Sequence, residues 1–74
     1  MEEKIIGLLK KIKSGIDYAN ESAIFTGHIL DSLEFVKFVS SVEEEFSVSI
    51  DFDDMEPEKF DSVSIIRQTI EKQI

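Results

Sequence analysis

The stretch DSLEFVKFVSSVEEEF, residues 31–46, carries the strongest secondary-structure signal in this 74-residue chain. Asp31 is followed three residues later by Glu34, which is the spacing of a helix-capping box. At about 100° per residue, one face of such a helix is apolar; it carries Phe35, Val39, Val42 and Phe46, with Val36 and Phe38 on its flanks. We therefore predict an amphipathic helix over residues 32–46 with a buried aromatic stripe.

The other face of this helix is polar and mostly acidic. By the same geometry the side chains that point away from the core are Lys37, Ser40, Ser41 and Glu44. Glu43 and Glu45 border the core face, and Glu34 projects outward. Leu33 falls on the polar side beside Ser32, so the sequence predicts an exposed leucine next to a serine at the start of the helix.

Before this helix, residues 2–15 have helical apolar spacing, with Ile5, Leu8, Leu9, Ile12 and then Ile16. Ser14-Gly15 is expected to end that helix, because glycine adopts the left-handed conformation that closes many helices. Residues 16–31 lack a clean period and contain Gly27. They indicate a long loop with room for a short helical turn, and loops of this length are often functional.

After residue 46 the sequence predicts an acidic loop over residues 47–56. Pro57 suits the first position of a short helix over residues 57–60, because its fixed φ angle matches the helical one. Ser62 is expected to cap a last helix over residues 63–73, with Val63, Ile66 and Ile70 facing inward. No strand pattern or repeat is found. The expected fold is all-α: residues 1–74 form one domain, a small bundle of three main helices and one short helix.

Composition excludes several classes of protein. The chain has no cysteine and one histidine, His28, which excludes disulfides and multi-histidine metal sites. The net charge of −8 disfavours binding to nucleic acid or to anionic membranes. No apolar run approaches the ~18 residues of a membrane span, and the N-terminal MEEK lacks the basic region of a signal peptide. We expect a cytoplasmic monomer without catalytic residues, since a chain this short offers little room for a deep cleft.

The dipeptide Asp31-Ser32 has two interpretations at this stage. Aspartate and serine are both favoured at helix starts, and the same dipeptide, Asp61-Ser62, precedes the last predicted helix. The context of the two differs. Ser32 ends a long loop, lies beside an exposed leucine and precedes an acidic helix face, whereas Ser62 lies in a short connection. Ser32 is therefore the better candidate for chemistry.

The segment GHILDSLE, residues 27–34, followed by VEEEF, residues 42–46, resembles the attachment segment of the acyl carrier protein family. The segment MEPEKFDSV, residues 55–63, resembles the third-helix region of that family. The resemblance covers most of the chain. The lead-in GHIL is more similar to stand-alone carriers of amino acids or specialised metabolites than to carriers of fatty acid synthesis.

The resemblance implies that Ser32 carries 4′-phosphopantetheine, with Asp31 either steering coenzyme A or capping the helix. A phosphopantetheinyl transferase with a divalent metal would install the arm, and loading and processing enzymes would act on the acyl or aminoacyl thioester. The implied docking surface for their basic patches consists of Leu33, Glu34, Glu43, Glu44 and Glu45. Lys37 departs from the pattern, because it makes this face less uniformly negative.

Two other functions remain open from the sequence. In the first, the chain is an acidic helical interaction module without a prosthetic group, and Asp31 and Ser32 only cap a helix. In the second, the acidic loop with Asp51, Asp53, Asp54 and Glu56 binds calcium. The spacing does not fit an EF-hand, because Met55 occupies a ligand position and Glu56 the position that requires glycine, so a solvated acidic loop is the better interpretation. His28 lacks a partner for metal binding.

The uneven charge distribution leads to a first prediction. Residues 17–58 carry a net charge of −11, while residues 1–16 carry +2 and residues 59–74 carry +1. Such a segment repels itself at low ionic strength, and salt screens the repulsion. We expect added salt or divalent cations to raise the melting temperature, measured by circular dichroism. A melting temperature that stays constant from low to high salt would contradict this.

Overall fold

Three α-helices form the frame of the protein: α1 spans Glu2–Ile12, α2 spans Ser32–Phe46 and α3 spans Val63–Lys72. The structure, a computed structural model, describes all residues 1–74 and contains no β-strand. α1 packs against both α2 and α3. The whole body measures 29 × 22 × 19 Å. The expected all-α architecture of three main helices is confirmed.

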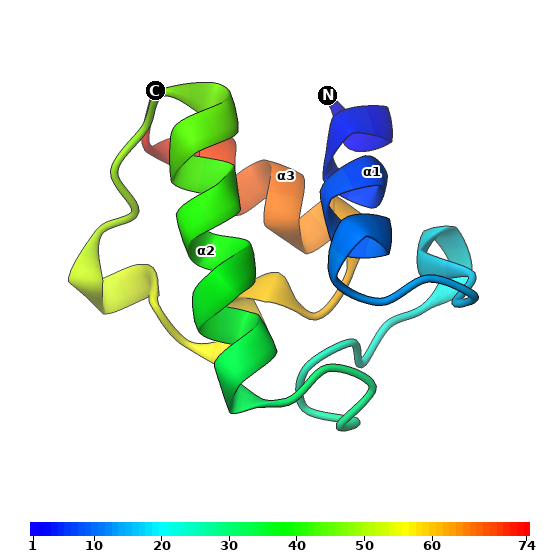
Figure 1. The fold of residues 1–74 in the computed structure, drawn as a ribbon. Coiled ribbons are helices and arrows are strands. Elements are labelled where there is room, and N and C mark those ends of the chain that lie inside the picture. The colour runs from blue at the N-terminus through cyan, green and yellow to red at the C-terminus, as the bar shows by residue number, and fades with distance from the viewer.

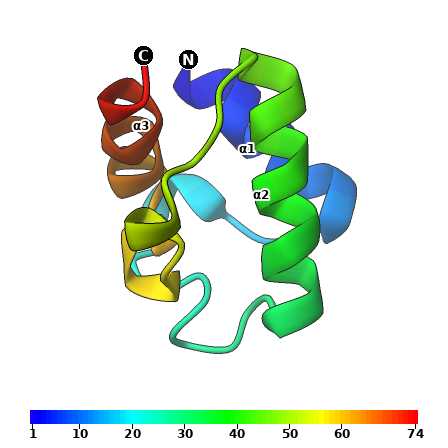
Figure 2. The same ribbon diagram turned by 90° about the vertical axis from the view of Figure 1, so that its left-hand side faces the viewer.

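α1 and α2 run in opposite directions between two ends of the molecule, and α3 crosses behind α2 (Figures 1 and 2). α1 runs from the end that holds both termini towards the opposite end, and α2 and α3 run back. The start of α2 therefore lies at the end far from the termini. The long loop between α1 and α2 lies at that same end, beside the segment that precedes α3.

α1 ends earlier than the sequence predicts, at Ile12 rather than near residue 15. Lys13 is already extended, and its carbonyl accepts a hydrogen bond from the Tyr18 hydroxyl at 2.6 Å. Gly15, with φ 87°, then takes the left-handed conformation expected of it, in the turn after the helix. The helical turn anticipated within the loop is a 3-10 helix, η1, over Tyr18–Asn20.

The buried face of α2 is rotated relative to the predicted stripe. Phe38, expected on the flank, is fully buried, while Phe35 and Phe46 are only half-buried. Val39 and Val42 are buried as predicted, and Val36 is 62% exposed. The reason is tertiary: α2 packs against α1, and the Phe38 ring also contacts Phe25 of the loop and Phe60 of the segment before α3.

The residues between α2 and α3 form two 3-10 helices, η2 over Phe52–Asp54 and η3 over Pro57–Phe60. The short fourth helix expected over residues 57–60 is therefore only a 3-10 turn, begun by Pro57. Thr69 of α3 fixes η3, because its hydroxyl donates to the Lys59 carbonyl at 2.8 Å. α3 itself is capped by Ser62, as predicted, and ends one residue early, at Lys72.

The prediction of a solvated acidic loop is wrong for Asp54, which is 2% exposed. Its carboxylate accepts hydrogen bonds from Gln73 at 2.9 Å and Lys72 at 3.0 Å, and it pairs with Lys59 at 3.6 Å. The bonds from Gln73 and Lys72 hold the pKa of Asp54 below its usual value, although burial opposes this. Asp54 thus ties η2 to the end of α3.

None of the helices has both the length and the apolar character that crossing a membrane requires.

Two phenylalanines in this region allow a matched test of the core. Phe60 is fully buried, whereas Phe52, eight residues earlier, is 85% exposed. We expect Phe60→Ala to lower the free energy of unfolding by about 3–5 kcal/mol, which is as much as a core of this size supplies. Phe52→Ala is expected to change it by less than about 0.5 kcal/mol. Urea unfolding measured by circular dichroism would show both, and equal effects would contradict the burial that we describe.

Candidate functional site

The start of α2 separates the roles of Asp31 and Ser32. Asp31 is the N-cap: its carboxylate accepts from the Glu34 N–H at 2.8 Å, and the Glu34 carboxylate accepts from the Asp31 N–H at 2.9 Å. This is the capping box that the sequence predicted. Ser32 is the first helical residue. Its hydroxyl is exposed and makes no hydrogen bond to the rest of the protein.

The two Asp-Ser dipeptides differ in register by one residue. In α3 the serine, Ser62, is the N-cap, and its hydroxyl accepts from the Ile65 N–H at 3.1 Å. In α2 the aspartate caps and the serine lies one position inside the helix. Capping therefore accounts for Ser62 but leaves the Ser32 hydroxyl without a structural role.

Backbone donors also surround Ser32. The N–H groups of Ser32 and Leu33 lie in the first turn of α2 and have no acceptor within the protein. Asp31 accepts only from the N–H groups of Glu34 and Phe35. Unpaired N–H groups and the helix dipole favour an anion at such a position. A phosphate esterified to the Ser32 hydroxyl would lie next to these donors, so the residues present fit that group.

Asp61, just before α3, holds the loop that leads to Ser32. Its carboxylate accepts from the N–H groups of Phe25 and Thr26, both at 2.9 Å, and from the Thr26 hydroxyl at 2.6 Å. The Asp61 carbonyl accepts from the Ile24 N–H at 3.0 Å. These bonds fix residues 24–26 against the start of α3.

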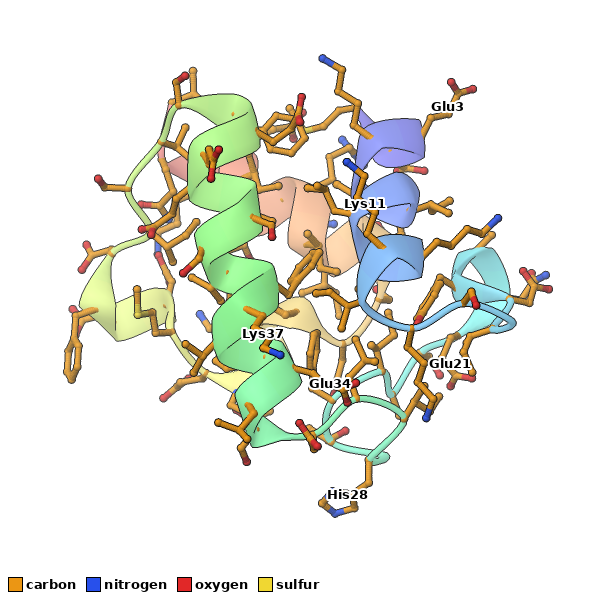
Figure 3. All side chains as sticks on the ribbon, viewed as in Figure 1. Glu3, Lys11, Glu21, His28, Glu34 and Lys37 are labelled. Carbon is orange, nitrogen blue, oxygen red and sulfur yellow. The ribbon has the colours of Figure 1, made fainter.

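The same loop is closed on itself. The Leu30 N–H donates to the Ile24 carbonyl at 3.0 Å, and both side chains are buried. Gly27 allows a tight turn between them, since a Cβ atom at this position would lie 2.5 Å from the Ala23 carbonyl oxygen. His28 adopts a positive φ of 62° and projects from the loop away from the body (Figure 3).

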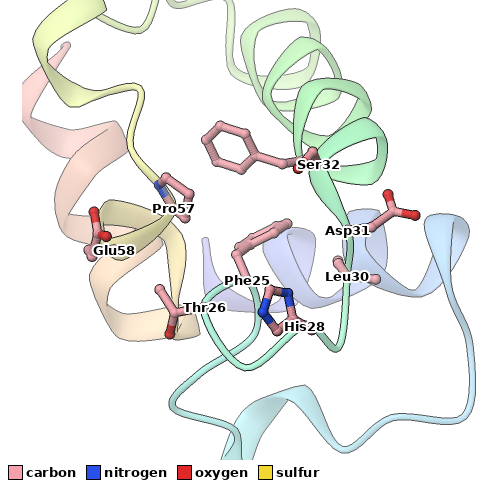
Figure 4. Close-up of a pocket in the computed structure, with 9 residues that line it drawn as sticks. Phe25, Thr26, His28, Leu30, Asp31, Ser32, Pro57 and Glu58 are labelled. Atoms are coloured by element: carbon pink, nitrogen blue, oxygen red, sulfur yellow. The ribbon is translucent and has the colours of Figure 1, made fainter.

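A pocket of about 290 Å³ opens beside Ser32. One wall is the loop and the start of α2, and the other is the beginning of η3 (Figure 4). The residues that line it are Phe25, Thr26, His28, Leu30, Asp31, Ser32, Phe35, Pro57 and Glu58. Of these lining residues, the sequence predicted Asp31 and Ser32 as site residues. Phe25, Thr26, Leu30 and Phe35 lie within seven residues of Ser32, whereas Pro57 and Glu58 come from a segment that is distant in the chain.

The five predicted docking residues are placed unequally. Leu33 is 74% exposed beside Ser32, as predicted, and Glu44 is exposed with no ion pair. Glu45 is exposed and lies 3.9 Å from Lys4. Glu34 and Glu43 are half-buried, and their carboxylates accept hydrogen bonds from backbone N–H groups. Glu34 closes the capping box, and Glu43 accepts from the Ile50 N–H at 2.8 Å. The Glu34 carboxylate, expected to project outward, turns back at the surface to accept from the Asp31 N–H.

Tyr18 connects this site to α1. It is 1% exposed, and burial, followed by the nearby charge of Glu34, raises the pKa of its phenol. Lys13 donates to the Ile29 carbonyl at 3.1 Å, so the end of α1 also supports the loop.

The acidic residues at positions 51–56 do not converge on a common point, and no cluster of three potential metal ligands occurs anywhere in the chain.

Comparison of this chain with protein-family models, with curated proteins and with solved structures finds no match.

The role of Asp61 leads to a prediction about stability. Asp61→Ala leaves two backbone N–H groups and a hydroxyl without their acceptor, so we expect it to lower the free energy of unfolding by roughly 2–3 kcal/mol at neutral pH. Burial opposes ionisation of Asp61, but the bonds from Thr26 and Phe25 outweigh burial and hold its pKa below the usual value. The stability that its charge contributes is therefore present above the unfolded pKa, about 3.9, and is lost as the pH falls through the lower folded value.

Asp61→Asn removes the charge and keeps one acceptor oxygen. Urea unfolding at neutral pH and at acid pH should show a smaller loss of stability in Asp61→Asn than in the wild-type protein. Asp53→Asn is the matched control, because the exposed Asp53 carboxylate accepts no hydrogen bond. An Asp61→Asn protein with the wild-type acid response would contradict the assignment.

Proposed function

We propose that this protein is an acyl carrier protein, which holds an acyl or aminoacyl group as a thioester on a 4′-phosphopantetheine arm attached to Ser32. The observation that carries the proposal is the division of roles at the start of α2. Asp31 caps the helix, so the exposed Ser32 hydroxyl is free to react. The resemblance of residues 27–34 and 42–46 to the attachment segment of that family supports the same residue.

The attachment chemistry requires little of the carrier itself. The Ser32 oxygen forms an ester bond to the phosphorus of coenzyme A that bears the pantetheine, the pyrophosphate bond breaks, and the adenosine bisphosphate leaves with its electron pair. A phosphopantetheinyl transferase and its divalent metal would take up the hydroxyl proton and stabilise the leaving group. The carrier contributes an accessible hydroxyl and a helix N-terminus that tolerates the new negative charge. In this proposal the chain is not itself an enzyme.

The arm supplies the thiol that the cysteine-free chain lacks, and the reaction at that thiol belongs to partner enzymes. The arm reaches on the order of 20 Å when extended. Because Ser32 lies at the end of the molecule opposite both termini, the arm can swing without crossing the body (Figure 1). The use of coenzyme A leads us to expect that the protein acts in the cytoplasm.

Partner enzymes are proposed to dock on α2 next to the arm. Leu33 and Val36, 74% and 62% exposed, are one helical turn apart and form an apolar spot beside Ser32. Glu44 and Glu45 farther along α2 supply negative charge for a basic patch on the partner, while Glu34 and Glu43 contribute charge from positions that also hold backbone. Opposite charges speed encounter and apolar contact adds affinity. Lys37 lies on the same exposed surface of α2 (Figure 3) and favours partners with a matching acidic group.

A competing proposal is an acidic interaction module without a prosthetic group. It keeps the same exposed face of α2 and needs no reaction at Ser32. The capping geometry disfavours it only in part, since an exposed serine at the first helical position is compatible with both functions. Loading of Ser32 distinguishes the two.

The test is the intact mass after incubation with coenzyme A, magnesium and a promiscuous phosphopantetheinyl transferase. We expect the wild-type protein to gain the mass of one phosphopantetheine and Ser32→Ala to gain none. Ser62→Ala is the matched control from the second Asp-Ser dipeptide. It loses a cap worth about 1 kcal/mol, remains folded and should still be loaded. Absence of a mass gain in folded wild-type protein would support the interaction module instead.

A further inference from the structure

The pocket beside Ser32 is closed on its inner side by aromatic rings. Phe25 and Phe35 both line it, and their ring centroids lie 5.1 Å apart in an edge-to-face arrangement. Phe25 is 5% exposed. Figure 4 shows Phe25 below Ser32, between the loop and η3. A group that enters the pocket from Ser32 therefore contacts these two rings before it reaches the core.

Two further phenylalanine rings lie behind Phe25 and Phe35. Phe35 contacts Phe60 at 5.3 Å and Phe60 contacts Phe38 at 6.3 Å, both edge-to-face, and Phe38 contacts Phe25 at 5.9 Å. The four phenylalanines thus form a closed circuit that joins the loop, α2 and η3. Phe38 and Phe60 are fully buried and do not line the pocket. We call Phe25, Phe35, Phe38 and Phe60 the aromatic ring cluster.

The cluster occupies the space that an apolar chain would need. Protein interiors are close-packed, and extra methylene groups force neighbouring side chains out of their preferred rotamers. Displacement of any one ring would break two ring–ring contacts at once, because each ring in the circuit touches two others.

No other cavity offers an apolar route into the core. The second pocket is lined by Leu8, Lys11, Ser41, Glu44 and Glu45. The third is lined by Asp54, Lys59, Ile65, Gln68, Thr69 and Lys72. Each has one hydrophobic residue, and neither is lined by Ser32 or by any ring of the cluster. The surroundings of Ser32 itself are also partly polar, with Thr26, His28, Asp31 and Glu58 in the wall.

From this geometry we propose that the cargo is a short polar acyl group, of the aminoacyl kind, that stays in solvent. This inference rests on the proposed function, since it concerns the group carried on Ser32. A long alkyl chain that extends beyond the pocket finds no place in the core, so its remaining apolar surface stays in water, where it is unfavourable. A short acyl group with an ammonium or hydroxyl group is well solvated there and needs no cavity. The aromatic ring cluster therefore selects the class of cargo by closing the interior.

The experiment compares two loaded forms of the wild-type protein. A phosphopantetheinyl transferase transfers the arm of an alanyl or an octanoyl coenzyme A analogue to Ser32, and adenosine bisphosphate leaves; an amide replaces the thioester so that neither form hydrolyses. Intact mass confirms each loading and tests the proposed function separately. The readouts are the ring-proton chemical shifts of the four clustered phenylalanines and the melting temperature.

We expect the alanyl and octanoyl forms to share the same ring-proton shifts and the same melting temperature. An octanoyl form with shifted Phe35, Phe38 or Phe60 signals and a higher melting temperature would show that the chain enters the core, because a group that binds only the folded state stabilises it. That result overturns the inference and leaves the proposed function intact. A folded protein that gains no mass overturns both.

A variant tests the cluster directly. Phe35→Ala removes the ring between the pocket and Phe60, so its octanoyl form should now melt at a higher temperature than its alanyl form. Phe52→Ala, the same truncation at an exposed site, should keep the two forms equal. If Phe35→Ala folds and still shows no difference, the role given to the cluster is wrong. If it does not fold, Phe35→Leu, which keeps an apolar side chain and removes the ring, replaces it.

Discussion

The hydrogen bonds of the buried Asp61 carboxylate fix the loop that precedes α2. The rest of the structure at the Ser32 end of the molecule depends on this loop. The Asp61 side chain accepts from Phe25 and Thr26, and its carbonyl accepts from Ile24. A loop of this length would otherwise sample many conformations, because each ordered residue loses backbone entropy. Since the bonds are charge-assisted and shielded from water, they offset that cost. The loop then delivers Asp31 to the start of α2 in the extended conformation that an N-cap requires.

The fixed loop also completes the aromatic ring cluster. Phe25 comes from the loop, Phe35 and Phe38 come from α2, and Phe60 comes from η3. Asp61 adjoins Phe60 in sequence and bonds Phe25 in space, so the same few residues position both the ring that faces the pocket and the ring behind it. The same contacts therefore position both the exposed Ser32 hydroxyl and the aromatic ring cluster that closes the core beneath it.

Much of this arrangement was predictable from local patterns. The capping box at Asp31 and Glu34, the exposed Leu33, the cap at Ser62 and the inward face of the last helix all follow from spacing within one turn. The residues that were missed act between segments. Asp61 was interpreted as part of a helix start, although the dipeptide Asp61-Ser62 offers two capping residues for one N-cap position. That redundancy was the available signal that Asp61 has another partner. The sequence around Asp54 gave no such signal, because its neighbours Asp51 and Asp53 are exposed acids of the same kind.

The sequence by itself determined that the chain is helical and acidic, where each main helix lies, and which serine follows a long loop. Those properties depend on residue type, on apolar period and on capping, and all of these act over a few neighbouring positions. Only the tertiary structure decided which face of α2 is buried, which acids are held in the interior, and that four phenylalanines close the core below the pocket. These features depend on segments that are distant in the chain, such as Thr26 and Asp61 or Phe35 and Phe60. Their contacts exist only after the chain has folded.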